Sequence, residues 1–243
     1  MEIIVGKTAG FCFGVENAVT KAEKELEIRK PVYCLGELVH NRQVVEDLTK
    51  KGIVFIDDIK DAKGKVIIRS HGVSKEIYEV AKAKNVELVD LTCPKVLKIH
   101  EIAEKYAADG YYILLVGQAG HDEIIGTASY CGEYFSLIEE PEDVKIALEK
   151  LEKTEIKNIA LICQTTFNLE KFNKIADIVE KELSKKNLEV INTVCSATKE
   201  RQDETKEIAK ACDFMVIIGG RHSSNTRKLY EISRGVLQKC CTN

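Results

Sequence analysis

The stretch CPKVLKIHEIAEKYAADGYYILLVGQAGH, residues 93–121, contains one complete unit of the predicted fold. It begins at Cys93, continues through an amphipathic segment, and reaches a short apolar run over residues 111–116, which Gly117 follows. The amphipathic segment is typical of a helix and the apolar run of a buried strand. His121 then lies in a polar loop that opens another helix. The stretch therefore predicts the order cysteine, helix, strand, glycine and polar loop.

The same unit occurs three times along the chain, which indicates an internal structural repeat. Its origins are Cys12, Cys93 and Cys195. The glycines 24 residues after these cysteines are Gly36, Gly117 and Gly219, and the residues 28 positions after them are His40, His121 and Ser223. Each glycine follows residues that are typical of the end of a strand. We therefore expect the three cysteines to occupy equivalent positions in three similar units.

Strand-like runs alternate with helical stretches along the chain, which favours an α/β fold with parallel sheets. The strand-like run at 65–69 leads into a polar loop, and the run at 158–163 does the same in the second unit. The equivalent part of a third unit would come after residue 243. We predict three pseudo-threefold-related α/β units around a central site, with the third unit incomplete. The expected units span residues 1–93, 94–194 and 195–243, and a strand in residues 1–11 is expected to join the third unit's sheet.

Composition narrows the class of protein. The chain has 243 residues, of which 44% are hydrophobic and 31% charged, so it can bury a core and is not disordered. The net charge of −3 argues against nucleic-acid binding. The longest apolar run, Tyr111–Val116, is too short to span a membrane, and the first residues do not resemble a signal peptide. We expect a cytoplasmic protein that binds neither nucleic acid nor membrane.

Nine cysteines are many for a cytoplasmic chain, where disulfides are rare. If the three units surround an axis, then Cys12, Cys93 and Cys195 would meet near it. Three thiolates could hold a zinc ion or an iron–sulfur cluster. Zinc usually takes cysteine pairs of short spacing, which these are not, so single cysteines assembled by the fold suit a cluster better. The residues alone leave open a structural repeat with buried thiols.

The polar loops after the predicted strands are candidates for an anion site, because ligands bind beyond the carboxyl ends of parallel strands. Ser223, Ser224 and Asn225 could form a cradle for an anion, or they could simply cap a helix. His40 and His71 could add charge to a phosphate site, or be capping or core residues. The other two candidates are Glu123, a proton donor or an ordinary first-turn acid, and Thr165, a hydroxyl ligand or a cap.

Eight motifs along the chain together resemble the 4-hydroxy-3-methylbut-2-enyl diphosphate reductase family, which makes isoprenoid precursors in the non-mevalonate pathway. They lie in the same order as in the family and cover the whole chain. The motifs are GFCFGV at 10–15, GELVHN at 36–41, RSHG at 69–72, TCP at 92–94, GHDE at 120–123, QTTFN at 164–168, NTVCSAT at 192–198 and SSNT at 223–226.

The resemblance implies an iron–sulfur oxidoreductase that removes the hydroxyl group of its allylic diphosphate substrate to give isopentenyl and dimethylallyl diphosphate. It implies three α/β units around a [4Fe–4S] cluster with one open iron, held by Cys12, Cys93 and Cys195. Glu123 would supply protons, and a ferredoxin or flavodoxin would supply electrons. The diphosphate would be bound by His40, His71, His121, Ser223, Ser224 and Asn225, and Thr165 would contact the hydroxyl end.

Two departures from the family pattern stand out. The family usually has proline where this chain has Asp122, and it continues beyond residue 243 into a further strand and a serine-containing loop. Two other functions stay open: a non-catalytic iron–sulfur protein, and a phosphate-binding α/β module without metal.

Overall fold

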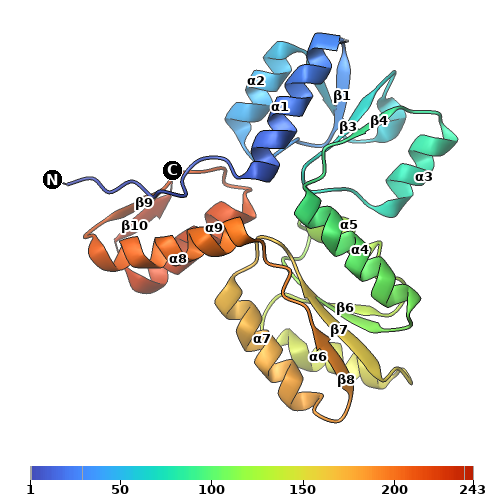
Figure 1. Cartoon of the computed structure of the whole chain (residues 1–243), viewed down its shortest axis with the longest axis vertical. Coiled ribbons are helices and arrows are strands. Elements are labelled where there is room, and N and C mark those ends of the chain that lie inside the picture. Colours follow the sequence, from blue (N-terminus) through green and yellow to red (C-terminus); the bar gives the residue numbers. More distant parts are fainter. Residues whose placement is uncertain (1, 29, 238, 243) are drawn as a thin grey trace.

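Each of the three lobes seen in Figure 1 is built on its own parallel β-sheet. The structure is a computed structural model that describes residues 2–28, 30–237 and 239–242. The elements, in chain order, are α1 (Phe13–Ile28), β1 (Val32–Leu35), α2 (Arg42–Lys51), β2 (Ile53–Ile56), η1 (Ile59–Asp61), β3 (Val66–Ile68), α3 (Lys75–Ala83), β4 (Leu88–Asp90), α4 (Pro94–Ala108), β5 (Tyr112–Val116), α5 (Asp122–Ala128), β6 (Phe135–Ile138), α6 (Asp143–Glu152), β7 (Asn158–Cys163), α7 (Leu169–Glu182), β8 (Asn187–Val190), α8 (Ser196–Ala211), β9 (Met215–Ile217), α9 (Ser224–Val236) and β10 (Cys240–Thr242).

The first two sheets have the same topology. The strand order is β2-β1-β3-β4 in the first lobe and β6-β5-β7-β8 in the second, with every described pairing parallel. Parallel strands need crossover connections, and the crossover helices cover both faces of such a sheet. The expectation of repeated parallel α/β units is therefore confirmed.

Strand β5 shows why the apolar runs are continuous. All five of its residues are buried, and alternate side chains enter different cores. Leu114 packs in the core that α6 and α7 cover, whereas Ile113 and Leu115 pack in the core that α4 and α5 cover. Because both faces are covered by helices, a polar residue on either face would be buried without solvent.

The third sheet differs from the other two. Among the described residues it consists of β9 and β10, which pair in parallel with Cys240 opposite Met215. Several apolar side chains near β9 remain exposed, including Phe214 and Ile218. Where the sequence analysis expects an incomplete third unit, the described part of this sheet has fewer strands than the other two.

The strand predicted in the N-terminal segment is wrong for the described residues 2–11, none of which is in a strand. The segment runs along the third lobe in Figure 1. Its backbone N–H groups do not pair with a strand but donate to the side chain of Glu204 on α8. The N–H groups of Lys7 and Thr8 donate to this carboxylate over 2.6 and 2.9 Å. Ile3 and Val5 stay about three-quarters exposed, at 74% and 73%. Apolar residues alone do not make a strand without a partner edge. Residue 1 lies outside the described residues.

In the part of the chain that the structure describes, no helix has the length and apolar character needed to cross a membrane.

The Glu204 contact gives a test of how the N-terminal segment is held. Replacing Glu204→Ala removes the acceptor for two backbone N–H groups, and hydrogen bonds to a charged group stabilise by roughly 1.5–3 kcal/mol. We expect amide hydrogen exchange at Lys7 and Thr8 to become about tenfold faster or more. Glu207→Ala, an exposed acid on the same helix, is the control. Unchanged exchange in Glu204→Ala would contradict the assignment.

Candidate active site

Each of the three cysteines stands at the start of a helix. Cys12 precedes α1, and its carbonyl accepts from the N–H of Glu16 over 3.0 Å. Cys93 is the N-cap of α4, and Cys195 is the N-cap of α8. The Cys195 sulfur accepts from the N–H of Thr198 over 3.4 Å. The positive end of a helix dipole favours a thiolate, so the equivalent positions give all three sulfurs the same electrostatic setting.

The three sulfurs lie near one another. Burial raises the pKa of the Cys93 thiol, and the charges of Cys12 and Cys195 raise it further, while two backbone N–H groups oppose the shift. Gly14 shows how tightly this centre is packed, because a Cβ placed there would come 2.7 Å from the Cys93 sulfur and 4.0 Å from the Cys12 sulfur. A cationic group bound between the sulfurs would relieve the mutual repulsion of three thiolates.

Backbone hydrogen bonds join the cysteines to the polar loops. The N–H of Cys93 donates to the carbonyl of Ser70 over 2.9 Å, next to His71. In the same way, the N–H of Cys195 donates to the carbonyl of Thr165 over 3.0 Å. The loops after β3 and β7 are thereby held against two of the three sulfur-bearing helices.

Three histidines from two lobes form a cluster. The rings of His40 and His71 stack with centroids 4.0 Å apart, and His121 meets them edge-on at 5.4 and 5.7 Å. His121 caps α5, its Nδ1 accepting from the N–H of Glu123 over 3.1 Å. The neutral His121 ring therefore carries its proton on Nε2, where it can donate to a ligand oxygen.

Two of the three rings, His71 and His121, have lowered pKa values. Burial lowers the pKa of His121 to about 4, with contributions from the charges of His40, Arg69 and Arg227 and with Asp122 opposing them. Burial, His40, His121 and Arg69 hold the pKa of His71 well below 6.5. His71 and His121 are therefore neutral at pH 7 and offer hydrogen bonds rather than charge.

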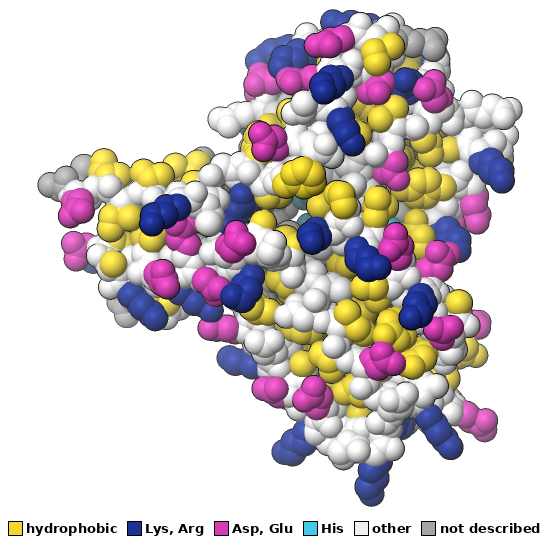
Figure 2. Space-filling view, in the orientation of Figure 1, with side chains coloured by type: hydrophobic (Ala, Val, Ile, Leu, Met, Phe, Trp, Pro, Cys, Tyr) yellow, Lys and Arg dark blue, Asp and Glu magenta, His cyan; other side chains and the backbone are white. Residues whose placement is uncertain are grey.

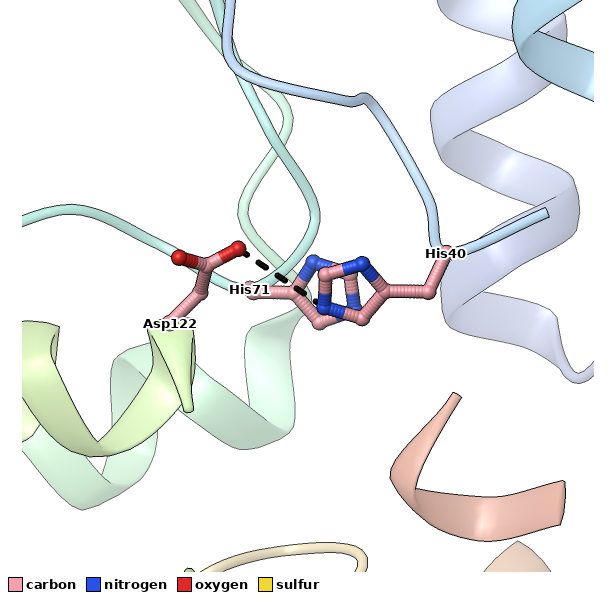
Figure 3. A group of neighbouring side chains, drawn as sticks. All are labelled: His40, His71 and Asp122. Atoms are coloured by element: carbon pink, nitrogen blue, oxygen red, sulfur yellow. Dashed lines mark ion pairs between the residues drawn. The ribbon is translucent and has the colours of Figure 1, made fainter. Parts of the chain in front are cut away.

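The geometry of the histidine rings disfavours a metal ion at this cluster. Among the described residues, His40, His71 and Asp122 have ligand atoms within 4.8 Å of one another, and Figure 3 shows the carboxylate directed at the stacked rings. A ring nitrogen binds a metal in the plane of its ring, at about 2.0–2.1 Å for zinc. The planes of His40 and His71 are 19° apart and stacked, so they do not converge on one ion.

Glu123 is the buried acid of the site. Only 1% of it is exposed, and both of its oxygens accept hydrogen bonds from Thr165: Oε1 from the backbone N–H over 2.6 Å, and Oε2 from the hydroxyl over 2.7 Å. Burial raises the pKa of Glu123 to about 7, even though the bonds from Thr165 lower it. A carboxyl with this pKa can give or take a proton at neutral pH.

The third lobe brings the start of α9 to the same centre. Ser223 caps this helix by accepting from the N–H of Thr226 over 3.3 Å, and Ser224 beside it is buried. The amide of Gln164 lies 3.5 Å from the Ser224 hydroxyl. The loop before α9 also reaches the first lobe, because a Cβ on Gly220 would fall 2.2 Å from the carbonyl oxygen of His40.

Comparison with known proteins identifies the family. A family model described as LytB protein matches residues 3–242. The chain belongs to the LytB family. A relative from Alkaliphilus oremlandii, named 4-hydroxy-3-methylbut-2-enyl diphosphate reductase, is 40% identical over 96% of this chain and 82% of the relative. One from Clostridioides difficile has the same name, identity and coverage. These names place the LytB-family chain among oxidoreductases.

Two solved structures agree with this assignment. The E-1-hydroxy-2-methyl-but-2-enyl-4-diphosphate reductase from Plasmodium falciparum is 30% identical, with a TM-score of 0.87 over 96% of this chain and 73% of that one. A second, titled (E)-4-hydroxy-3-methyl-but-2-enyl diphosphate reductase, the terminal enzyme of the non-mevalonate pathway, is 37% identical, with a TM-score of 0.70 over 99% of this chain and 84% of that one. The likeness of fold therefore comes with likeness of sequence.

The LytB-family chain brings its sequence-predicted residues together in linked groups. The sulfurs interact electrostatically, the histidines form one ring cluster, and Thr165 holds Glu123. Asn225 is in the first turn of α9, beside Ser224. Sequence reasoning assigned no role to Arg69 or Gln164, although each directly follows a strand, where polar residues reach the site.

The buried carboxyl of Glu123 gives a stability test with a defined sign. Its pKa is raised from 4.5 to about 7, so the folded protein binds a proton more tightly than the unfolded chain. Stability from this group is present below pH 4.5 and is lost as the pH rises toward 7. Relative to Glu123→Gln, we expect the free energy of unfolding to fall by about 3 kcal/mol across this window. Denaturant titrations of both proteins at several pH values measure it, and a flat difference would contradict the raised pKa.

Proposed function

We propose that this chain is a 4-hydroxy-3-methylbut-2-enyl diphosphate reductase, which removes the allylic hydroxyl group and yields isopentenyl and dimethylallyl diphosphate. The observation that carries the proposal is the backbone link of Cys195 to Thr165, whose side chain in turn holds the buried acid Glu123. With Glu123 as the proton donor, this link would bring the donor next to the proposed cluster ligands. Proton donor and redox centre are the two requirements of a reductive loss of water.

The three cysteines fit a [4Fe–4S] cluster as the group they would hold. The donor set is three cysteine sulfurs at helix N-termini, and burial, followed by the charges of Cys12 and Cys195, raises the pKa of Cys93. The three sulfurs come from separate segments of the chain and not from a cysteine pair of short spacing, the arrangement that zinc usually takes, and their charges interact. When bound, such a cluster supplies electrons and an open iron that acts as a Lewis acid.

The protein's own residues would bind the substrate and move protons. His40, His71 and His121, together with Ser223, Ser224 and Asn225, would hold the diphosphate in hydrogen bonds. The Thr165 hydroxyl would orient the substrate hydroxyl, and Glu123 would protonate it as the C–O bond breaks. The reaction consumes two electrons and two protons, releases water, and forms one C–H bond. Anchoring the diphosphate fixes the reacting carbon against the acid and so reduces the entropic part of the barrier.

The electrons would come singly from a small carrier protein, a ferredoxin or a flavodoxin. Reduced thiols at the proposed cluster require a reducing compartment, which supports a cytoplasmic location. The cysteines described as free include all three proposed ligands.

The test is turnover by anaerobically prepared protein that carries its iron and sulfide. We expect reduction of the diphosphate substrate with a low-potential electron donor. Cys12→Ser, Cys93→Ser and Cys195→Ser should each lose iron and activity. Glu123→Gln should keep its iron and lose about 10²–10⁴-fold in kcat. Protein that binds iron and sulfide without turnover would favour the non-catalytic alternative.

Gly14 provides a separate test of the cysteine centre. Gly14→Ala puts a methyl group 2.7 Å from the Cys93 sulfur, closer than the atoms can approach, so the sulfur must move. We expect a lower iron content after anaerobic reconstitution, measured by elemental analysis. Gly64→Ala is the matched control, because its added methyl group meets no atom within 4 Å. Equal iron in the two variants would contradict the expectation that iron binding needs the Cys93 sulfur at its place beside Gly14.

A further inference from the structure

A diphosphate brings several negative charges into the histidine cluster, where His71 and His121 offer no charge to offset them. His71 and His121 are neutral at pH 7 for the reasons given above. Neutral imidazoles donate hydrogen bonds, but hydrogen bonds to an anion are stronger when the donor is charged. A permanent cation at the site would supply what the imidazoles lack.

Arg69 is placed to be that cation. It directly follows β3, its side chain is 18% exposed, and its charge lowers the pKa of both His71 and His121. The backbone beside it is shaped around the guanidinium, because a Cβ on Gly36 would fall 2.2 Å from Nη1. The Nε lies 3.4 Å from the carbonyl oxygen of Gly72. The guanidinium is therefore held in place beside the histidines.

The Arg69 guanidinium forms an ion pair with the Asp122 carboxylate in the structure. Its Oδ1 lies 2.9 Å from Nη2 of Arg69, and its Oδ2 lies 3.7 Å from Nε2 of His40 (Figure 3). A carboxylate uses the same donor geometry of arginine that a phosphate group uses. A negative side chain beside an anion site opposes binding of the anion, because it repels the anion and occupies the same N–H donors.

We propose that Arg69 binds the diphosphate and that Asp122 holds the Arg69 guanidinium in the absence of the anion, competing with it. The inference rests on the proposed function for the identity of the anion. The inference adds Arg69 to the residues that bind the diphosphate, beyond the three histidines and residues 223–225. On binding, Arg69 exchanges part of its pairing with Asp122 for phosphate oxygens.

The rival explanation is a structural ion pair. Arg69 belongs to the first lobe and Asp122 to the second, so the pair could simply tie the lobes together. Another pair between these lobes, Lys75 with Glu104, offers a matched comparison about half exposed on the surface. The two explanations predict different signs for the change in anion affinity when Asp122 is replaced. A structural tie predicts that losing either partner weakens binding, whereas competition predicts opposite effects.

The experiment measures the affinity of inorganic pyrophosphate for the anaerobic holoenzyme by calorimetry. We expect Arg69→Gln to weaken binding about tenfold, and Asp122→Asn to tighten it about threefold to tenfold. Arg69→Lys, which keeps the charge but loses the planar fork, should lie between wild type and Arg69→Gln. The double variant should gain nothing from Asp122→Asn. Lys75→Gln and Glu104→Gln should leave the affinity unchanged. Melting temperatures identify any variant that does not fold.

Weaker binding in both single variants, or wild-type protein that binds no pyrophosphate, would overturn the inference. Turnover is scored separately with the allylic diphosphate substrate. Opposite changes in pyrophosphate affinity in the Arg69 and Asp122 variants, without turnover, would support the competition between Asp122 and the anion and reject the proposed function. Turnover with shifts in the same direction would do the reverse.

Discussion

The carboxyl ends of parallel strands point in one direction, and this constraint decides where every candidate site residue lies. In each lobe the residues that follow the strands emerge toward the neighbouring lobes, as do the starts of the helices that carry the cysteines. In Figure 2, a little of the cyan that marks histidine side chains is visible in the narrow space where the three lobes meet. Backbone bonds from Cys93 and Cys195 to these loops turn this common direction into fixed positions. Residues that are far apart in the sequence are thus brought together because the strands of each sheet end toward the same centre.

Burial gives the residues of this centre their chemical character. The same desolvation that raises the pKa of Glu123 to about 7 lowers that of His121 to about 4. An acid that can still donate a proton and an imidazole that has already lost its charge therefore exist side by side at one pH. Glu123 and His121 are two residues apart in α5 and its cap, so one short helix carries both functions.

The fold could be predicted where local sequence suffices. Strand β5 is a continuous apolar run, and the repeated cysteine and glycine positions indicated the three units. Prediction failed where pairing depends on distant residues. Residues 2–5 look like a strand but are not in one, and Glu204 holds the segment farther along, at Lys7 and Thr8. Strand β10, by contrast, is only three residues long and pairs with β9. Within the site, the sequence indicated the ligand candidates. It did not indicate that Asp122 meets Arg69, because 53 positions separate them and only the packing of two lobes joins them.

Helix α8 holds two parts of the sulfur centre at once. Cys195 caps its start, and Arg201 on the same helix donates to the carbonyl oxygens of Thr8 and Gly10, just before Cys12. Cys12 itself directly precedes α1 of the first lobe, where its carbonyl accepts from the N–H of Glu16. The two bonds from Arg201 therefore tie the backbone just before Cys12 to the third lobe. A swing of the third lobe would move Cys195 directly and would also pull on the segment that leads into Cys12.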